Sequence, residues 1–201
     1  MDQITTLQML LMSDPLRRRI LQAVAAINLP DCWVGAGFAR DAVWDSLHGY
    51  DVAPPNGDVD VIWYDSTSVR SDLDRTIEHQ LSHAVPGLVW SVKNQARMHT
   101  RNNDAPYMSI SEAMHHWPET ATAVAARLDD FGVVEINAPF GLDDLFALRL
   151  RPTPRFMTEK LPIFLERVSS KRWMHRYPNL SLEMPDLPLA AAFGTRSSQT
   201  K

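Results

Sequence analysis

Residues 33–41 of the chain are Trp33-Val34-Gly35-Ala36-Gly37-Phe38-Ala39-Arg40-Asp41, and residues 58–61 are Asp58-Val59-Asp60-Val61. The apolar run before Gly35 predicts a strand that enters a tight turn, and the residues from Phe38 to Leu47 predict a helix. Glycines ahead of a helix let the backbone approach a phosphate closely, and the helix N-terminus adds a favourable positive potential. The backbone of Gly35, Ala36 and Gly37 is therefore expected to lie against the phosphates of a nucleotide.

The acidic pair in the second stretch opens the clearest strand of the sequence, which is expected from Val59 to Tyr64. Side chains two residues apart on a strand share a face, so Asp58 and Asp60 project their carboxylates into the same space. Two such carboxylates suit Mg²⁺ (or Mn²⁺) when phosphate and water oxygens complete its octahedron. A lone Asp-x-Asp is more often solvated, and a lone Gly-x-Gly is usually a turn. The two in this order predict a metal–nucleotide site.

Apolar periodicity and capping residues predict the remaining elements. Helices are expected over residues 16–27, 71–83, 142–150 and 158–176, with another that begins at Ser109 or Ser111 and ends before Pro118; strands are expected over 88–93 and 133–137. Residues 121–128 fit either a helix or a strand. This mixture of strands and helices predicts an α/β (α+β) fold with a short mixed sheet flanked by helices.

Length and composition limit the possible classes of protein. A chain of 201 residues, 45% hydrophobic and 22% charged, is typical of one globular domain, which is expected over residues 1–184 with a flexible tail over 185–201. The net charge of −4 argues against a general nucleic-acid coat protein, and the single cysteine excludes an intrachain disulfide. Neither a signal peptide nor a membrane-spanning segment is recognisable, so a cytoplasmic protein without a membrane partner is expected.

Longer strings in the sequence carry a family resemblance. They are Arg40-Asp41-Ala42-Val43-Trp44-Asp45 with Leu47-His48-Gly49, Asp58-Val59-Asp60-Val61, Val92-Lys93-Asn94-Gln95-Ala96-Arg97-Met98-His99, Trp117-Pro118-Glu119-Thr120-Ala121-Thr122 and Ala138-Pro139-Phe140-Gly141-Leu142-Asp143-Asp144-Leu145. Over most of residues 15–180, the chain resembles a bacterial nucleotidyltransferase-like family of the DNA polymerase beta-like nucleotidyltransferase superfamily. Residues 33–41 also resemble the opening of tRNA CCA-adding enzymes. Their helical tRNA-binding extension is not recognisable here, so nucleic acid is not the favoured acceptor.

The resemblance implies transfer of a nucleoside monophosphate from a nucleoside triphosphate to an unidentified acceptor hydroxyl, with Mg²⁺ (or Mn²⁺) bound by Asp58 and Asp60. A third catalytic carboxylate is not evident, and Glu135 on the strand over 133–137 is the best remaining candidate. Ala36 stands where the superfamily usually has glycine or serine, so a hydroxyl contact to phosphate is missing. A degenerate, non-catalytic nucleotide- or RNA-binding module is the alternative.

Several charged residues near these motifs have two interpretations each. Lys93, Asn94 and Arg97 follow a predicted strand and are expected to contact the triphosphate or the base, although ordinary solvated side chains would give the same pattern. Arg40 is expected to contact phosphate with Asp41 supporting it, and an intrahelical or interhelical ion pair is the equally good alternative.

Two further groups suggest other hypotheses. His79 and His83 lie four residues apart on a predicted helix, as zinc ligands can, but no cysteine pair or His-Glu-x-x-His accompanies them, so a solvated helix face is favoured. The C-terminal third is basic and aromatic, which suits either RNA binding or a helix packed over the sheet, and packing is favoured. Its residues are Lys160, Arg167, Lys171, Arg172, Trp173, His175, Arg176 and Tyr177.

Overall fold

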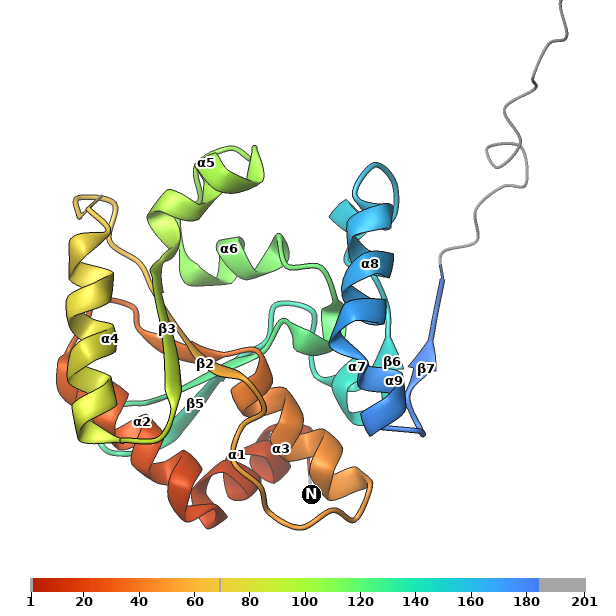
Figure 1. Ribbon diagram of the computed structural model, residues 1–201, viewed down its shortest axis with the longest axis horizontal. Coiled ribbons are helices and arrows are strands. Elements are labelled where there is room, and N and C mark those ends of the chain that lie inside the picture. The colour runs from red at the N-terminus through yellow and green to blue at the C-terminus, as the bar shows by residue number, and fades with distance from the viewer. Residues whose placement is uncertain (1, 69, 185–201) are drawn as a thin grey trace, which may run out of the picture.

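A five-stranded mixed sheet forms the centre of the computed structural model, which describes residues 2–68 and 70–184 (Figure 1). The strand order is β3-β2-β1-β4-β5. The strands are β1 (Trp33–Gly35), β2 (Asp58–Trp63), β3 (Val89–Asn94), β4 (Ala125–Leu128) and β5 (Val134–Asn137). This sheet and the helices around it confirm the predicted fold class. The tail expected over residues 185–201 lies outside the described residues.

The strand pairings place β1 and β2 side by side. β1 runs antiparallel to both β2 and β4, and Gly35 pairs with Asp60 on one side and with Ala125 on the other. β2 and β3 are parallel and are joined through α4 (Asp72–Ala84), because parallel neighbours need a crossover connection. β4 and β5 form an antiparallel hairpin. The predicted glycine turn and the acidic pair therefore meet on neighbouring strands.

Helices cover one face of the sheet and form the main core with it. They are α1 (Gln3–Ser13), α2 (Pro15–Ile27), α3 (Gly37–Leu47) and α4. Asp14 caps α2 and Pro15 occupies its first turn, as the sequence predicts. The side chains of β2 that face these helices, Val59, Val61 and Trp63, are fully or almost fully buried. Because strand side chains alternate, Asp58 and Asp60 face the other way.

The opposite face of the sheet carries a smaller apolar cluster. The cluster contains Trp33, Ile62, Ala125, Ile110 and Met114. The last two come from α6 (Ile110–His115). In Figure 1, α6 and α5 (Met98–Asn102) lie on the side of the sheet away from α1 and α2, with α8 (Leu161–Lys171) beside them. This face is therefore covered only in part, and the acidic pair lies on it.

Three predicted segments near the C-terminus differ from the structure in detail. Residues 121–128, which fitted helix or strand, form β4 after a single 3₁₀ turn. The helix expected over 142–150 has one turn, because Leu148 adopts a φ of 56° and the chain then enters a strand. The helix expected over 158–176 is interrupted at Arg172, whose φ is 52°. The elements are α7 (Asp143–Phe146), β6 (Arg149–Leu150), which pairs with β7 (Ser181–Leu182), α8 (Leu161–Lys171) and α9 (Trp173–Arg176).

Within residues 2–68 and 70–184, no helix is both long enough and apolar enough to cross a membrane.

Candidate functional site

The turn between β1 and α3 is built on an alanine in a glycine-like conformation. Ala36 has φ 52° and ψ −118°, and its N–H donates to the Val124 carbonyl at 2.9 Å. An L-residue pays about 1–3 kcal/mol of strain in such a region, so the surrounding contacts must hold it there. α3 begins directly afterwards, and no side chain caps it. The N–H groups of its first turn therefore lie beside this turn without a capping side chain.

A neighbouring indole ring leaves no room for a side chain at Gly35. A Cβ atom at this position would lie 2.9 Å from Cη2 of Trp117 and 3.5 Å from Cδ1 of Ile62. The first distance is shorter than real carbon contacts allow, so any side chain would displace the ring. The sequence interpretation attributed this glycine to a close phosphate approach, whereas the structure supplies a packing reason that stands without a ligand.

Asp58 and Asp60 lie at the start of β2 on the partly open face of the sheet. Asp58 is exposed, Val59 is buried and Asp60 is partly buried, which is the alternation expected of a strand with one covered face. Asp60 pairs with Gly35 of β1 and with Ser91 of β3. The acidic pair therefore adjoins the turn that opens α3.

In the protein without a bound metal ion, the surroundings of Asp60 disfavour the ionised form of its carboxyl group. Burial, followed by repulsion from Asp58, raises the pKa of Asp60 to about 6. A hydrogen bond from Ser91 and the positive charges of Arg167 and Lys171 oppose this rise in pKa. The repulsion shows that the two carboxylates act on one another, and a bound divalent cation would relieve it.

A cavity of about 600 Å³ opens beside Asp60. Its wall includes Ala36 of the turn, Trp117 and Phe156 as aromatic surfaces, and four cationic side chains. The cations are Lys93, Arg101, Lys160 and Arg167. Among the described residues on the wall, Asp60 is the only carboxylate. A wall of this composition suits a ligand with several negative charges and a flat apolar part.

Lys160 and Arg167 were not predicted as site residues, because the segment that carries them also packs against the core. Phe164 and Val168 are buried against the core, four residues apart on one side of α8. Arg167 lies on the cavity wall, and Lys160 precedes the helix. The sequence interpretation chose packing over ligand binding for this segment, and the structure shows packing on one side and a cavity on the other. The signal was available in the amphipathic spacing of these residues.

Comparison with known proteins places this geometry in a family. The sequence pattern of a family described as nucleotidyltransferase matches residues 22–182. The chain belongs to this nucleotidyltransferase family. The match confirms the resemblance seen in the sequence, and nucleotidyl transfer is the general chemistry that it supports. No curated protein sequence matches the chain.

Solved structures show where the nucleotidyltransferase fold recurs. One, described as an NMR structure that reveals a CCA-adding enzyme head domain, is 29% identical with a TM-score of 0.79, and the match covers 90% of this chain and 95% of that one. A CCA-adding enzyme in complex with CTP is 19% identical with a TM-score of 0.54, and the match covers 90% of this chain and 43% of the enzyme. The Thermotoga maritima CCA-adding enzyme complexed with tRNA is 17% identical with a TM-score of 0.53, over 90% and 42% respectively. The chain thus spans less than half of these two enzymes, which show the fold alone.

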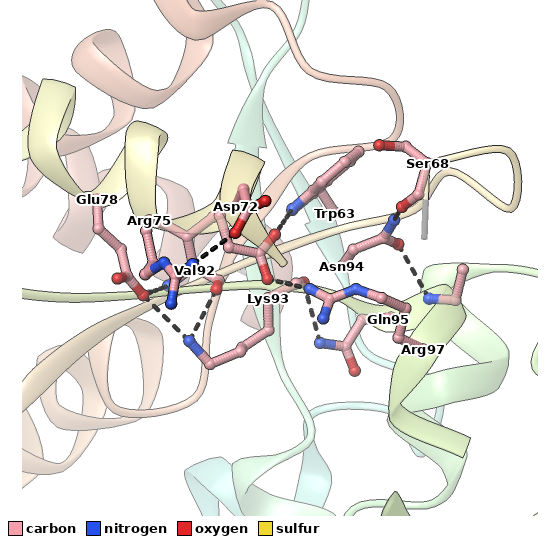
Figure 2. Close-up of polar contacts among 12 residues, drawn as sticks. Trp63, Ser68, Asp72, Arg75, Glu78, Val92, Lys93, Asn94, Gln95 and Arg97 are labelled. Carbon is pink, nitrogen blue, oxygen red and sulfur yellow. Dashed lines mark hydrogen bonds and ion pairs between the residues drawn. The ribbon is translucent and has the colours of Figure 1, made fainter. Parts of the chain in front are cut away.

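Of the three polar residues in this part of the chain that were expected to contact nucleotide, Lys93 and Asn94 end β3 and Arg97 follows it; only Lys93 lies on the cavity wall. Its Nζ already donates to Glu78 Oε1 at 3.0 Å and to the Val92 carbonyl at 2.9 Å (Figure 2). Asn94 is completely buried and donates to the carbonyls of Asp65 and Ser68 at 2.8 and 2.7 Å. Asn94 therefore fastens the loop after β2 to the end of β3.

Arg97, which is labelled in Figure 2, forms an ion pair with Asp74 of α4. Asp74 also accepts a hydrogen bond from Nε1 of Trp63 at 3.0 Å, and it is 3% exposed. Arg97 is not part of the cavity wall. These contacts therefore give Asn94 and Arg97 each a role in holding the fold together. A nucleotide contact for either residue stays a prediction.

Replacement of Arg97 by alanine is expected to lower the free energy of unfolding by about 2–3 kcal/mol, because the buried Asp74 loses its counter-charge. Nucleotide titration of the folded variant tests separately the nucleotide contact that the sequence predicts for Arg97. Urea unfolding followed by tryptophan fluorescence measures the first quantity. Arg75→Ala is the control, since that arginine pairs with Asp72 on the exposed face of the same helix and should change stability little. Equal effects of the two variants would contradict the structural role of Arg97.

Arg40 and Asp41 form the buried ion pair that was the alternative interpretation. The Arg40 Nε donates to Asp41 Oδ1 at 2.8 Å, and its guanidinium lies between the rings of Trp44 and Trp173, 5.2 and 4.9 Å from their centroids. Asp41 Oδ2 accepts from the N–H of Asn56 at 3.3 Å. The pair therefore connects α3 to the loop before β2. Arg40 does not line the cavity, so its expected phosphate contact has no support in this geometry.

Glu135 lies on β5, which is separated from β2 by two strands. Its carboxylate pairs with Nε of Arg127 at 2.6 Å. It lines a different cavity of about 520 Å³, which shares no wall residue with the one beside Asp60. The structure therefore does not bring Glu135 to the acidic pair. The sequence pattern places a residue on a face of a strand, but it does not give the order of the strands.

The two histidines of the zinc hypothesis, His79 and His83, stack on α4 with ring centroids 4.8 Å apart. In the described part of the chain, no group of three or more histidine, cysteine, aspartate or glutamate side chains is arranged to hold a metal ion. A metal at Asp58 and Asp60 would therefore need substrate or water oxygens as its other ligands.

Proposed function

We propose that the protein transfers a nucleoside monophosphate from a nucleoside triphosphate to an acceptor hydroxyl and releases pyrophosphate. The observation that carries the proposal is the cavity of about 600 Å³ whose wall combines Asp60, the turn at Ala36 and four cations. Its volume lies within the ~300–1,000 Å³ typical of small-molecule sites. A triphosphate is the ligand whose charge suits several cations beside a carboxylate that can bind metal.

Asp58 and Asp60 are the residues that would hold a divalent cation. Both face the same side of β2, and burial together with Asp58 raises the pKa of Asp60 to about 6. This donor set fits Mg²⁺ or Mn²⁺, because carboxylate oxygens are their usual ligands and the cation would remove the repulsion. When bound, the metal would neutralise charge that develops on the phosphate oxygens.

The other side chains of the cavity would position the nucleotide. Arg101, Lys160 and Arg167 of the cavity wall would bind phosphate oxygens, and the first turn of α3 would add the positive end of a helix dipole. Trp117 and Phe156 offer surfaces on which a base can stack. Phosphoryl transfer depends chiefly on positioning and electrostatic stabilisation, so these contacts would carry much of the rate.

A non-catalytic nucleotide- or RNA-binding module is the second candidate, and one observation favours it. Ser91 and Lys93 occupy the β3 positions beside Asp60 and Ile62, so β3 supplies no carboxylate there. Without a further carboxylate, activation of the acceptor hydroxyl has no evident base. The net charge of −4 argues for a single nucleotide over a long nucleic acid as the ligand of such a module.

Calorimetric titration with each of the four ribonucleoside triphosphates, in Mg²⁺ and again in EDTA, tests the proposal. Binding that requires Mg²⁺, together with pyrophosphate release when small alcohols or RNA 3′-hydroxyls are added, is the expected result. Binding of RNA or nucleotide that is indifferent to Mg²⁺ would support the binding module instead. Absence of binding to all four nucleotides and to RNA would contradict both.

A further inference from the structure

We propose that Arg167 binds the triphosphate of the substrate and that Glu119, buried behind it, is the positioning residue that fixes its guanidinium. This inference rests on the proposed function, because it concerns the same cavity. Neither residue belongs to the glycine turn or the Asp-x-Asp stretch, and the two come from segments far apart in the sequence. Glu119 precedes the 3₁₀ turn before β4, and Arg167 lies in α8.

Glu119 has no exposed surface, yet both of its carboxylate oxygens are used. Oε1 accepts from Arg167 Nε at 2.8 Å, and Oε2 accepts from the Thr122 hydroxyl at 2.7 Å. A buried carboxylate is tolerated only when it is paired and hydrogen-bonded in this way. Arg167 and Thr122 both line the cavity, whereas Glu119 does not. Glu119 therefore orients two wall residues from behind the wall.

Arg167 is anchored at one end of its guanidinium. Nε is taken by Glu119, and the group lies over the ring of Trp173, 5.5 Å from the centroid. Within the described residues, its two terminal amino groups donate no hydrogen bond. Arginine–carboxylate pairs are frequently bidentate, with two parallel N–H···O bonds from the guanidinium. Here the planar group is held by a single bond and a ring, which leaves both terminal amino groups for a bidentate contact with phosphate.

The position of Arg167 relative to the acidic pair fits this role. Arg167 and Asp60 line the same cavity, the first from α8 and the second from β2. A triphosphate whose oxygens bind a metal at Asp60 would therefore carry its remaining charge toward Arg167. Lys171 of the same helix is exposed and is not among the residues that line this cavity.

The test measures affinity for the ribonucleoside triphosphate that the wild type binds best, and for the corresponding nucleoside, both in Mg²⁺. Arg167→Met is expected to weaken triphosphate binding about 10- to 100-fold, the loss of a charged hydrogen-bonding group, while nucleoside affinity stays unchanged. Arg167→Lys should recover only part of the loss, because lysine keeps the charge without the fork. Lys171→Met is the matched control for charge alone and should have a much smaller effect, since exposed charges are screened.

The role of Glu119 is separated from that of Arg167 by a double-mutant cycle. Glu119→Gln, which keeps the shape of the side chain, should weaken triphosphate binding in the wild type and have no further effect in the Arg167→Met background. Thermal unfolding checks that each variant is folded, and Arg167→Met alone decides the phosphate contact if Glu119→Gln is unstable. Equal losses of triphosphate and nucleoside affinity, or additive effects of the two substitutions, would overturn the inference. A wild type that binds no nucleotide would refute the proposed function itself.

Discussion

Replacement of Asp60 by asparagine is expected to abolish Mg²⁺-dependent nucleotide binding and to lower turnover about a thousandfold, equivalent to ~4 kcal/mol of transition-state stabilisation. Asparagine keeps the shape of the side chain and removes the charge that would hold the cation beside Asp58. Initial rates of pyrophosphate release, with calorimetry of nucleotide binding, give the two quantities. Asp130→Asn removes the same charge from an exposed carboxylate of the other cavity and should leave both unchanged.

The same substitution should make the metal-free protein more stable at neutral pH. The folded-state pKa of Asp60 is raised to about 6 from an ordinary value of 3.8. Below about pH 4 the carboxyl is protonated in both states, so the two proteins should unfold alike. Between pH 4 and 6 the unfolded wild type loses its proton first, which favours unfolding, and above pH 6 the penalty remains at roughly 2–3 kcal/mol. Urea unfolding of both proteins at pH 4 and pH 7.5 in EDTA checks this. A stability difference that does not change with pH would contradict it.

Replacement of Gly35 by valine is expected to destabilise the protein by about 3 kcal/mol and to remove nucleotide binding. A Cβ atom there would lie 2.9 Å from Cη2 of Trp117, so the ring must leave its place on the cavity wall. If Gly35 served only the approach to phosphate, such a variant would lose nucleotide binding and keep much of its fold. The structure indicates that stability and binding fall together. Thermal and urea unfolding measure the first, and calorimetry the second.

A second pair of variants separates the ring from the phosphate as the reason for Gly35. Trp117→Phe removes the atom that a new Cβ would meet. The loss of stability caused by Gly35→Ala should therefore fall by at least ~1 kcal/mol in the Trp117→Phe background. An undiminished loss would show that the glycine is needed for its backbone rather than for the indole.

Local pattern was enough to predict the elements that form the site. The apolar run before Gly35, the helix after Gly37 and the strand that begins at Asp58 all appear where periodicity and turn chemistry placed them. These features depend on neighbours in the sequence, and period-two spacing also put Asp58 and Asp60 on one face correctly. The order of the strands depends on long-range pairing, which left Glu135 on β5, away from the acidic pair.

The cavity wall was harder to predict because identical side chains serve opposite purposes in this chain. Arg97 follows a strand near the site, but its charge is neutralised by an ion pair with Asp74. Arg167 lies on a helix that packs against the core, and yet its side chain lines the cavity. What separates them is the partner that each arginine meets, and both partners are remote in sequence. The sequence shows which residues are charged. Only the tertiary contacts show whether a charged side chain is already paired within the protein or is available to a ligand.

The last strand of the five-stranded sheet ends at Asn137, and Arg167 lies thirty residues further along the chain. During synthesis, at ~5–20 residues per second, the acidic pair therefore emerges several seconds before the arginine that faces it. A nascent chain arrested between Asn137 and the start of α8 would contain every strand of the five-stranded sheet. In that chain Asp58 and Asp60 would repel one another, and α8 would not yet have been synthesised. On the ribosome, the nascent chain would thus be able to form the sheet before it could bind nucleotide, and the synthesis of α8 would set the moment at which the proposed substrate could first bind.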